Sequence, residues 1–288
     1  MNIPANSELA TDKDVQFTDA EFHKFRDFVY ERTGISLSDA KKLLLYRRLI
    51  SRLEFHGFQS FTEYFSYLKQ GDDKELELFT NAVTTNLTSF FREQHHFDYL
   101  SETLLPELVK KKRHGEKKLR IWSAGCSTGE EAYSIAITLC DALPDINSWD
   151  AKILCTDLDS QVLETCRAGI YPTEGLERVS SKIVDKWFHP VDGYRKPSVE
   201  VDPKLKQLTV FNQLNLMDPW PMKCPFDIIF CRNVFIYFDK PTQKQLIARY
   251  AQQLDTDGHL MLGHSETLHD IEEYFDLIGQ TIYRKVST

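Results

Sequence analysis

Residues 119–134 have the sequence LRIWSAGCSTGEEAYS, and this stretch decides the fold of the chain. Its apolar start, Leu119–Ala124, is typical of a buried strand, and a helical segment follows from Ala132 to Leu143. The turn between them holds Gly125 and Gly129. A glycine-rich turn from a strand into a helix lets a ligand approach the backbone and offers it the free amides of the helix N-terminus. The stretch therefore predicts the ligand-binding turn of an α/β domain.

The glycine spacing and the neighbouring charges indicate which ligand this turn binds. The pattern is G-x-x-x-G, without the third glycine of the dinucleotide fingerprint. Glu130 and Glu131 stand where a pyrophosphate would lie, and carboxylates there would repel it. They suit a cationic ligand with an amino group or a sulfonium, which favours S-adenosylmethionine over NAD or ATP. The alternative for one of the two glutamates is that it only complements the helix dipole.

Short apolar runs alternate with helical segments in the rest of the chain. The runs are Ile153–Thr156, Leu208–Leu214, Phe226–Cys231 and His259–Gly263. Strands that alternate with helices predict a parallel, doubly wound sheet, so we assign the α/β fold class. A last run, Gln280–Lys285, follows a turn-like glycine and is expected to add an antiparallel edge strand.

Polar residues stand where these strands end. In a doubly wound sheet the carboxyl ends of the strands form the ligand crevice. Asp157 follows the second strand directly, so we expect it to bind the ribose hydroxyls of an adenosine, and we assign the nearby Asp159 to capping the next helix. Asn215 is expected to reach the adenine edge and Asn233 the methionine portion. The alternative for each asparagine is a simple turn former.

The first third of the chain is predicted to be helical. Thr18 and Glu21 form a capping box, and Phe17 is placed to pack on Phe22, so a helix begins here. Further helical segments are predicted at 38–55, 60–69, 73–84 and 97–112.

These patterns divide the chain into two domains. We expect an α-helical domain over residues 1–92, with 1–14 disordered, and the α/β domain over 93–288. Within the second domain, 93–118 form a linker helix. Residues 172–207, where prolines and short polar segments interrupt the alternation, form a small inserted subdomain.

Composition excludes several classes of protein. The 288-residue chain has no apolar run long enough to cross a bilayer, and its polar start is no signal peptide. Its six cysteines form no C-x-x-C pair and there is no H-E-x-x-H motif, so we expect reduced thiols and no metal. The net charge of −8 argues against a nucleic-acid partner.

Five segments resemble the motifs of chemotaxis receptor methyltransferases of the CheR type, in the order of that family. They are TTNLTSFFRE at 84–93, STGEE at 127–131, TDLD at 156–159, FCRNVFIYF at 230–238 and GHSE at 263–266. The resemblance covers the chain from about residue 17 to its end. Five motifs in the right order are far more specific than a single glycine turn.

The resemblance implies a fold, a reaction and a set of site residues. The fold is an N-terminal all-α domain that recognises the substrate, a Rossmann-like methyltransferase domain and a small β-subdomain inserted in it. The reaction transfers a methyl group from S-adenosylmethionine to receptor glutamates and leaves S-adenosylhomocysteine. The cofactor contacts fall on Asn86, Thr88, Arg92, Glu131, Asp157, Asn215, Leu216, Arg232 and Asn233. Arg92 and Tyr237 resemble the residues of the catalytic centre.

The chemistry of a glutamate acceptor agrees with the residues present. A glutamate carboxylate has an unperturbed pKa of about 4.3, so it is ionised near neutrality and needs no general base. We therefore expect Arg92 to anchor the polar end of the cofactor and Tyr237 to orient the incoming carboxylate. The alternative for Tyr237 is a buried aromatic residue of the neighbouring phenylalanine cluster.

The partner implied by the resemblance is the helical cytoplasmic region of a chemotaxis receptor. Lys41, Arg48 and Arg52 share one helix face and are expected to bind its clustered glutamates. The alternative is a solvated face whose aliphatic stems cover the core. The segment 189–195 holds one glycine and is shorter than the loop that grips a receptor tether in some family members, so we expect no tether here. The enzyme is expected to be a cytoplasmic monomer that does not insert into the membrane.

Three other functions remain to be weighed. A methyltransferase with another acceptor would share the cofactor site but not the basic helix or the 84–93 segment. A signalling adaptor without turnover would show degenerate motifs, whereas Arg92, Asp157 and Tyr237 are all present. A dinucleotide oxidoreductase is disfavoured because the third glycine is missing.

Overall fold

The computed structural model describes residues 15–112, 115–267, 271 and 273–286 of the chain. The expected disorder of residues 1–14 lies outside this part. The chain divides into two compact units, one of residues up to 28 and 37–83, the other of residues 29–36 and from 84 onward.

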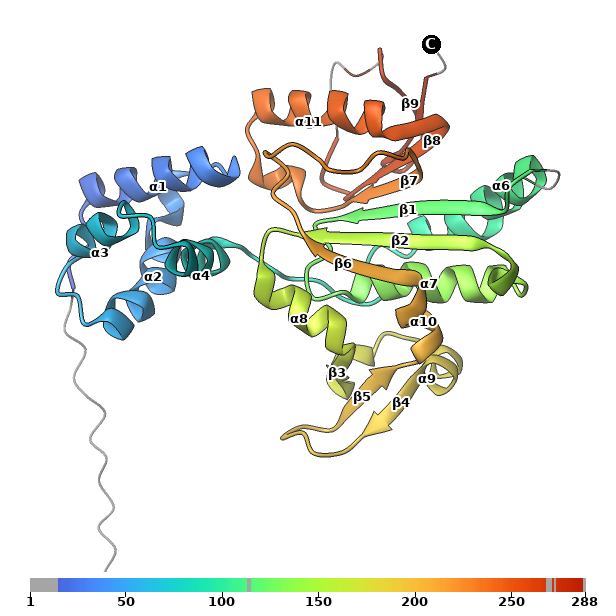
Figure 1. The fold of residues 1–288 in the computed structure, drawn as a ribbon, viewed down its shortest axis with the longest axis horizontal. Helices are drawn as coiled ribbons and strands as arrows, with labels where there is room; N and C mark the ends of the chain where they lie inside the picture. The colour runs from blue at the N-terminus through green and yellow to red at the C-terminus, as the bar shows by residue number, and fades with distance from the viewer. Residues whose placement is uncertain (1–14, 113–114, 268–270, 272, 287–288) are drawn as a thin grey trace, which may run out of the picture. The chain divides into compact units, whose positions relative to one another are not determined.

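The first unit is helical. Its elements are α1 (Asp19–Thr33, whose last turn belongs to the second unit), a 3₁₀ turn (Asp39–Lys41), α2 (Lys42–His56), α3 (Phe61–Leu68) and α4 (Asp73–Val83), as Figure 1 shows. Its core is built largely from phenylalanine. Phe25 is fully buried, and its ring lies 6.1 Å from the ring of Phe61 and 6.0 Å from that of Phe79.

The predicted start of α1 is confirmed. The amide of Thr18 donates to Glu21 Oε2 over 2.9 Å, and the amide of Glu21 donates to Thr18 Oγ1 over 3.2 Å. The ring of Phe17 lies 6.3 Å from that of Phe22. Helix α2 ends at Gly57, whose φ of 72° is the left-handed conformation that favours glycine at a helix end.

A buried carboxylate fixes helices α2, α3 and α4 to one another. The side chain of Glu75 is 4% exposed and accepts hydrogen bonds from Tyr64 Oη over 2.7 Å, from Arg52 Nε over 3.1 Å and from the Arg52 guanidinium a second time. His56 Nε2 lies 2.8 Å from the same carboxylate. Burial alone would raise the pKa of Glu75, but the hydrogen bonds from Arg52, His56 and Tyr64 lower it below its usual value.

Two of the three cations predicted to bind substrate therefore have partners inside the helical unit. Arg52 pairs with Glu75, and Arg48 Nη1 donates to the carbonyl oxygen of Val83 over 2.5 Å. These contacts favour the alternative in which Arg48 and Arg52 support the core. Lys41, which precedes α2, is exposed, and so is Arg47 of α2.

Replacing Arg52 by Ala is expected to lower the free energy of unfolding by about 3 kcal/mol, because it leaves the Glu75 carboxylate buried without its main counter-charge. Chemical denaturation of the full chain measures this loss. Arg47→Ala, on the exposed side of the same helix, is the matched control and should change stability by less than about 0.5 kcal/mol. Equal stability of the two variants would show that the Arg52–Glu75 pair does not hold the unit together.

The second unit is built on a seven-stranded sheet. Its strands are β1 (Lys118–Ala124), β2 (Asp150–Asp157), β6 (Thr209–Gln213), β7 (Phe226–Cys231), β8 (Leu254–Leu262), β9 (Phe275–Gly279) and β10 (Ile282–Lys285). They lie in the order β6-β2-β1-β7-β8-β10-β9, and the five strands from β6 to β8 are parallel. The predicted doubly wound parallel sheet is confirmed.

The end of the sheet differs in one respect from the prediction. Strand β10 is antiparallel to β8, as expected, but β9 pairs along its other side and forms the edge. Four of the five residues of β9 are exposed, so the strand lacks the apolar pattern that would have marked it in the sequence.

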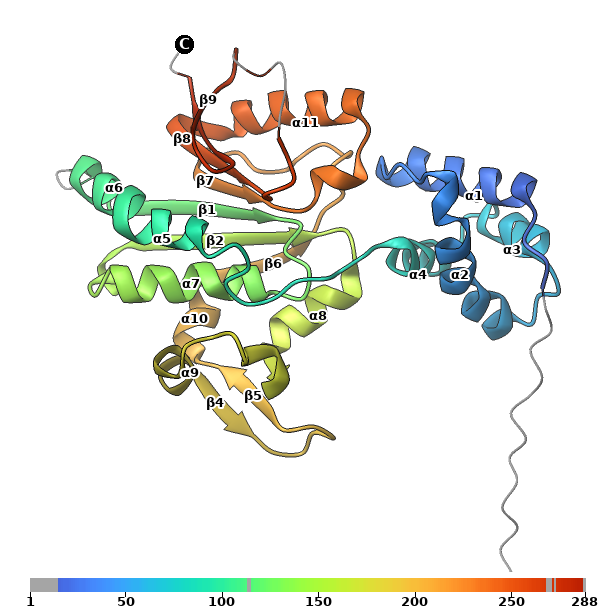
Figure 2. The same ribbon diagram turned by 180° about the vertical axis from the view of Figure 1, so that it is seen from behind.

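Helices cover both faces of the sheet, because successive residues of β1 point to opposite sides. Ile121 packs in a core with Ile135 of α7 (Glu130–Ala142), and Trp122 packs in a second core with Tyr250 of α11 (Lys240–Gln253). The first core also takes in the helical run α5 (His95–Tyr99), a π-turn (Leu100–Leu104) and α6 (Leu105–Lys112). Figure 2 shows α6 and α7 on the face turned away from the viewer in Figure 1.

A small subdomain is inserted between α8 (Ser160–Ala168) and β6. Its elements are β3 (Ile170–Pro172), a 3₁₀ turn (Thr173–Leu176), α9 (Ser181–Trp187), β4 (Phe188–Val191), β5 (Ser198–Val201) and α10 (Pro203–Leu208). The three strands form an antiparallel sheet in the order β3-β5-β4. The connection from β4 to β5 contains Gly193, and the absence of a tether at this connection stays a prediction.

The six cysteines are all free thiols, and four of them are buried. No helix in the described ranges has both the length and the apolar character needed to span a membrane.

Candidate cofactor site

The turn after β1 is as tight as its glycines suggest. Gly125 has a φ of 87°, and a Cβ atom on it would lie 2.4 Å from Val234 Cγ2. Gly129, with a φ of 99°, is the N-cap residue of α7. Between them Ser127 also has a positive φ, of 50°, which is uncommon for a residue with a side chain. Such strain is characteristic of ligand-binding turns.

Asp157 at the end of β2 faces this turn. Its Oδ2 accepts the amide of Ser127 over 2.8 Å and its Oδ1 accepts the amide of Asp159 over 3.0 Å, which leaves each oxygen a further lone pair. Burial raises the pKa of Asp157 to about 6. Asp159 caps α8 by accepting the amide of Gln161 over 2.9 Å, as predicted.

The irregular segment 84–93 lies along the same edge of the sheet. The carbonyl oxygen of Asn86 accepts Ser127 Oγ over 2.9 Å, and Asn86 Nδ2 donates to Asp159 Oδ2 over 2.7 Å. Further along, the amide of Phe91 donates to Ser134 Oγ over 2.9 Å. These bonds bring the predicted residue Asn86 to the glycine turn and tie Phe91 to α7; the predicted residues Thr88 and Arg92 belong to the same segment. Arg92 Nη1 donates to the carbonyl oxygen of Leu87 over 3.0 Å.

The two glutamates after the glycine turn have different surroundings. Glu130 accepts Thr128 Oγ1 over 2.6 Å at the first turn of α7, which fits the role of a helix-start residue. Glu131 is buried, accepts Ser123 Oγ over 2.7 Å and lies 3.2 Å from Arg232 Nη1. Burial raises the pKa of Glu131 even though Arg232 lowers it.

The strands β6 and β7 supply the other predicted residues. After β6, Asn215 Nδ2 donates to the carbonyl oxygen of Arg32 over 2.7 Å and Asn215 Oδ1 accepts the amide of Met217 over 3.0 Å, while Leu216 is buried. After β7, Tyr237 Oη donates to the carbonyl oxygen of Thr85 over 3.4 Å. Tyr237 thus reaches the 84–93 segment and is not simply packed among the phenylalanines.

Two acids that the sequence analysis gave no role hold the turn after β7. Glu266 accepts the amides of Asn233 and Gly263, each over 2.7 Å, and the amide of Ile236 over 3.2 Å. Glu93 accepts the amide of His264 over 3.0 Å, lies 2.8 Å from His264 Nδ1 and pairs with Arg232. Both acids lie in quoted motifs, but only the three-dimensional structure brings them to Asn233 and Arg232.

The groups gathered at this edge suit S-adenosylmethionine. Asp157 offers acceptors to a ribose diol, and the Glu131 carboxylate offers a counter-charge to an ammonium or a sulfonium. Arg232 Nε is buried and, among the described residues, has no hydrogen-bond partner, so it can still bind an acceptor. A pyrophosphate would be repelled by the carboxylates at this edge of the sheet.

Comparison with known proteins decides the family. The model described as "CheR methyltransferase, SAM binding domain" matches residues 86–284, and the one described as "CheR methyltransferase, all-alpha domain" matches residues 20–84. The chain belongs to the CheR methyltransferase family. The predicted resemblance, the fold class and the S-adenosylmethionine cofactor are thereby confirmed.

Curated relatives match this CheR-family chain over nearly their whole length. The probable chemotaxis protein methyltransferase of Rhizobium etli is 42% identical over 89% of this chain and 96% of that protein. Chemotaxis protein methyltransferase 2 of Pseudomonas aeruginosa is 41% identical over 96% of this chain and 97% of that protein. The chemotaxis protein methyltransferase of Salmonella typhimurium is 42% identical over 92% of this chain and 90% of that protein. A solved methyltransferase, CcbJ from Streptomyces caelestis, is 12% identical over 50% of this chain and 44% of its own, with a TM-score of 0.32 that is too low to add to the assignment.

A metal role is not supported at the edge of the CheR-family site. Within the described ranges, Glu93, His95 and His96 form a group whose ligand atoms lie within 4.8 Å of one another. The guanidinium of Arg232 lies 3.3 Å from the Glu93 carboxylate, and its charge would repel a metal ion. We therefore assign Glu93 to an ion pair with Arg232 and not to a metal site.

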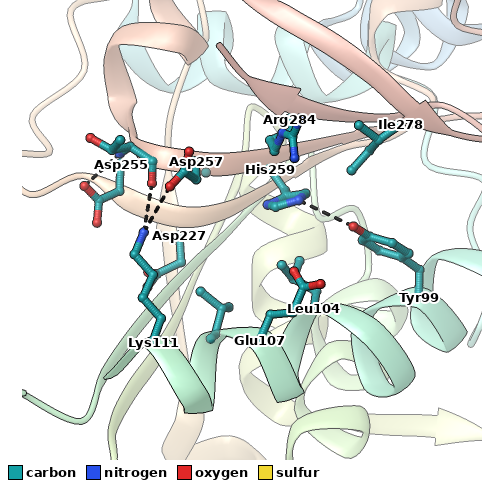
Figure 3. Close-up of a pocket in the computed structure, with 13 residues that line it drawn as sticks. Tyr99, Leu104, Glu107, Lys111, Asp227, Asp255, Asp257, His259, Ile278 and Arg284 are labelled. Atoms are coloured by element: carbon teal, nitrogen blue, oxygen red, sulfur yellow. Dashed lines mark hydrogen bonds and ion pairs between the residues drawn. The ribbon is translucent and has the colours of Figure 1, made fainter. Parts of the chain in front are cut away.

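A cavity of about 510 Å³ lies at the opposite ends of the strands (Figure 3). Asp227 near the start of β7 and Asp255 near the start of β8 help to line it. Figure 3 shows Lys111 of α6 directed toward Asp257, with Lys111 Nζ 3.4 Å from its carboxylate. Because cofactors of doubly wound folds bind at the carboxyl ends of the strands, this cavity is not the cofactor site.

Replacing Asp157 by Asn is expected to weaken S-adenosylmethionine binding at least about tenfold, because a carboxylate acceptor is lost. In the wild type, affinity should fall as the pH drops through about 6 and Asp157 takes up a proton. Calorimetry between about pH 5 and pH 7.5 measures both effects.

Protonation of Asp157 has the opposite effect on the stability of the ligand-free protein: a falling pH weakens cofactor binding but stabilises the fold. Since its pKa is raised in the folded state, the folded protein binds more protons than the unfolded chain, and this group adds stability as the pH falls through about 6. If S-adenosylmethionine binding by the Asp157→Asn variant depends on pH as it does in the wild type, a group other than Asp157 causes that pH dependence.

Proposed function

We propose that this CheR-family methyltransferase esterifies glutamate side chains in the helical cytoplasmic region of chemotaxis receptors. The observation that carries the proposal is that curated chemotaxis methyltransferases match nine-tenths of the chain at about 40% identity. The enzyme would act in the cytoplasm, as a monomer, with no nucleic-acid partner.

The chemistry of the cofactor edge supports a carboxylate acceptor. S-adenosylmethionine supplies a methyl group on its sulfonium, and an ionised glutamate attacks it without first losing a proton. The His264 imidazole near this site lies 2.8 Å from the Glu93 carboxylate, and the reaction asks no proton transfer of it. What the protein must supply is alignment of the carboxylate with the methyl group and exclusion of water.

Arg92 and Tyr237 are the residues proposed for this alignment. Both reach the 84–93 segment, Arg92 as a member of it and Tyr237 through its hydrogen bond to Thr85. Arg92 would anchor the polar end of the cofactor, and the Tyr237 hydroxyl would donate a hydrogen bond to the incoming carboxylate. A hydrogen bond of this kind fixes the direction of attack without moving a proton.

The exposed face of α2 is proposed to receive the receptor helix. It carries Arg47 together with Leu43, which is 58% exposed, and Phe55, which is 73% exposed, and Lys41 precedes it. An apolar and cationic face fits an amphipathic helix that carries glutamates. In this proposal Lys41 contacts the receptor directly, whereas Arg48 and Arg52 keep α2 in place.

Incubation with methyl-labelled S-adenosylmethionine and chemoreceptor membranes tests the activity. Base-labile methanol should be released, and receptor glutamate-to-glutamine variants should release none. Arg92→Ala should lower turnover by more than about a hundredfold, because an interaction that positions the cofactor is lost. Cofactor binding by the wild type without any methanol release would identify a different acceptor or an adaptor. Normal turnover in Arg92→Ala would remove that residue from the catalytic centre.

The docking face is tested by reversing its exposed charges. Lys41→Glu combined with Arg47→Glu should raise KM for the receptor by about tenfold, because each loses an attraction and gains a repulsion. Neither kcat nor the melting temperature should change, since both side chains are exposed. Replacement of Lys24, an exposed cation of α1, by Glu serves as the control for a charge reversal elsewhere on the helical unit. An unchanged KM in the double variant would place the receptor elsewhere.

A further inference from the structure

One guanidinium at the cofactor edge is shared by two carboxylates. The side chain of Arg232 is 2% exposed, its Nη2 lies 3.3 Å from Glu93 Oε2, and its Nη1 lies 3.2 Å from Glu131 Oε2. Glu93 and Glu131 are themselves only 10% and 11% exposed. Together the three groups carry a net charge of −1 when both glutamates are ionised.

Glu93 holds its position through more contacts than the ion pair alone. Its carboxylate accepts the backbone amide of His264 over 3.0 Å and lies 2.8 Å from the imidazole Nδ1 of the same residue. The backbone of Glu93 has a φ of 58°, as does that of Asn233, the residue after Arg232. Non-glycine residues keep this conformation only where the surroundings determine it. Glu93 therefore joins the 84–93 segment to the turns after β7 and β8.

The two carboxylates have different surroundings, although Arg232 lies at nearly the same distance from each. Burial opposes ionisation of Glu93, yet the hydrogen bond from His264 and the charge of Arg232 lower its pKa to about 2. Burial raises the pKa of Glu131, and the Glu93 charge adds to that rise. Because Arg232 lies within ion-pair distance of both carboxylates, it does not neutralise Glu131 alone.

We propose that Glu93 is a positioning residue that takes up part of the charge of Arg232 and so keeps the Glu131 carboxylate available to the cationic part of S-adenosylmethionine. Without the Glu93 charge, Arg232 would pair with Glu131 alone, and the three-group cluster would become neutral. The inference depends on cofactor binding and not on the identity of the methyl acceptor.

This division of charge distinguishes the substrate form of the cofactor from its product. S-adenosylmethionine carries an ammonium, a sulfonium and a carboxylate, a net charge of +1. S-adenosylhomocysteine has lost the sulfonium charge and is neutral overall. A cluster with a net charge of −1 therefore contributes more to the binding of the first ligand than to the binding of the second.

Calorimetry with both ligands on the full chain tests the proposal. Glu93→Gln, which keeps the size of the side chain, should weaken S-adenosylmethionine binding about tenfold and S-adenosylhomocysteine binding by only about threefold. Glu93→Asp keeps the charge and should restore the wild-type ratio of the two dissociation constants. Glu102→Gln removes an exposed carboxylate from the helical run that follows Glu93 and is the control.

A purely structural role for Glu93 predicts a different result. Loosening of the site would weaken both ligands by the same factor, and such a result would overturn the proposal, as would unchanged binding in Glu93→Gln. If Glu93→Gln does not fold, Glu131→Gln decides the matter in its place, because the same preference for the charged ligand should then be lost. An unchanged ratio in Glu131→Gln would equally overturn the proposal.

Discussion

The buried side chain of Arg232 is the constraint on which the cofactor edge depends. A charge that is almost fully removed from water must be matched by partners, because a stranded ion costs several kcal/mol. Arg232 finds them in Glu131 at the start of α7, in Glu93 and in the carbonyl oxygen of Arg92. Elements that are remote in the sequence are thereby fixed to one another, and the strained turns between them can be maintained.

The parts of this architecture that depend on local sequence could be predicted. Thr18 and Glu21 are three residues apart and form the expected capping box, and Asp159 caps the helix that directly follows it. The parallel sheet followed from apolar runs that alternate with helices, because strands buried on both faces need such runs. In each case the residues that interact are close in the chain or repeat with a fixed period.

The rest of the structure depends on contacts between residues that are far apart in the chain and that no sequence periodicity reveals. Arg52 and Glu75 stand 23 residues apart in the chain. The sequence alone therefore could not show that part of the basic face of α2 pairs with a buried carboxylate. Glu93 and His264 are 171 residues apart, and their contact exists only because β8 ends beside the 84–93 segment. Strand β9 was missed for another reason, since an exposed edge strand need not alternate. Family motifs marked several of these residues as important without showing what they contact.

The inserted subdomain is not a detachable module, although its antiparallel sheet is separate from the main one. The hydroxyl of Tyr171 in β3 donates to the carbonyl oxygen of Thr128 over 2.7 Å, and the ring of Phe188 in β4 packs against that of Phe90 at 5.1 Å. A chain trimmed to the bare doubly wound sheet would leave the glycine turn without one of its supports. Substitutions at the tip of the insertion leave these contacts intact, whereas substitutions at its base act directly on the support of the methyl-donor site.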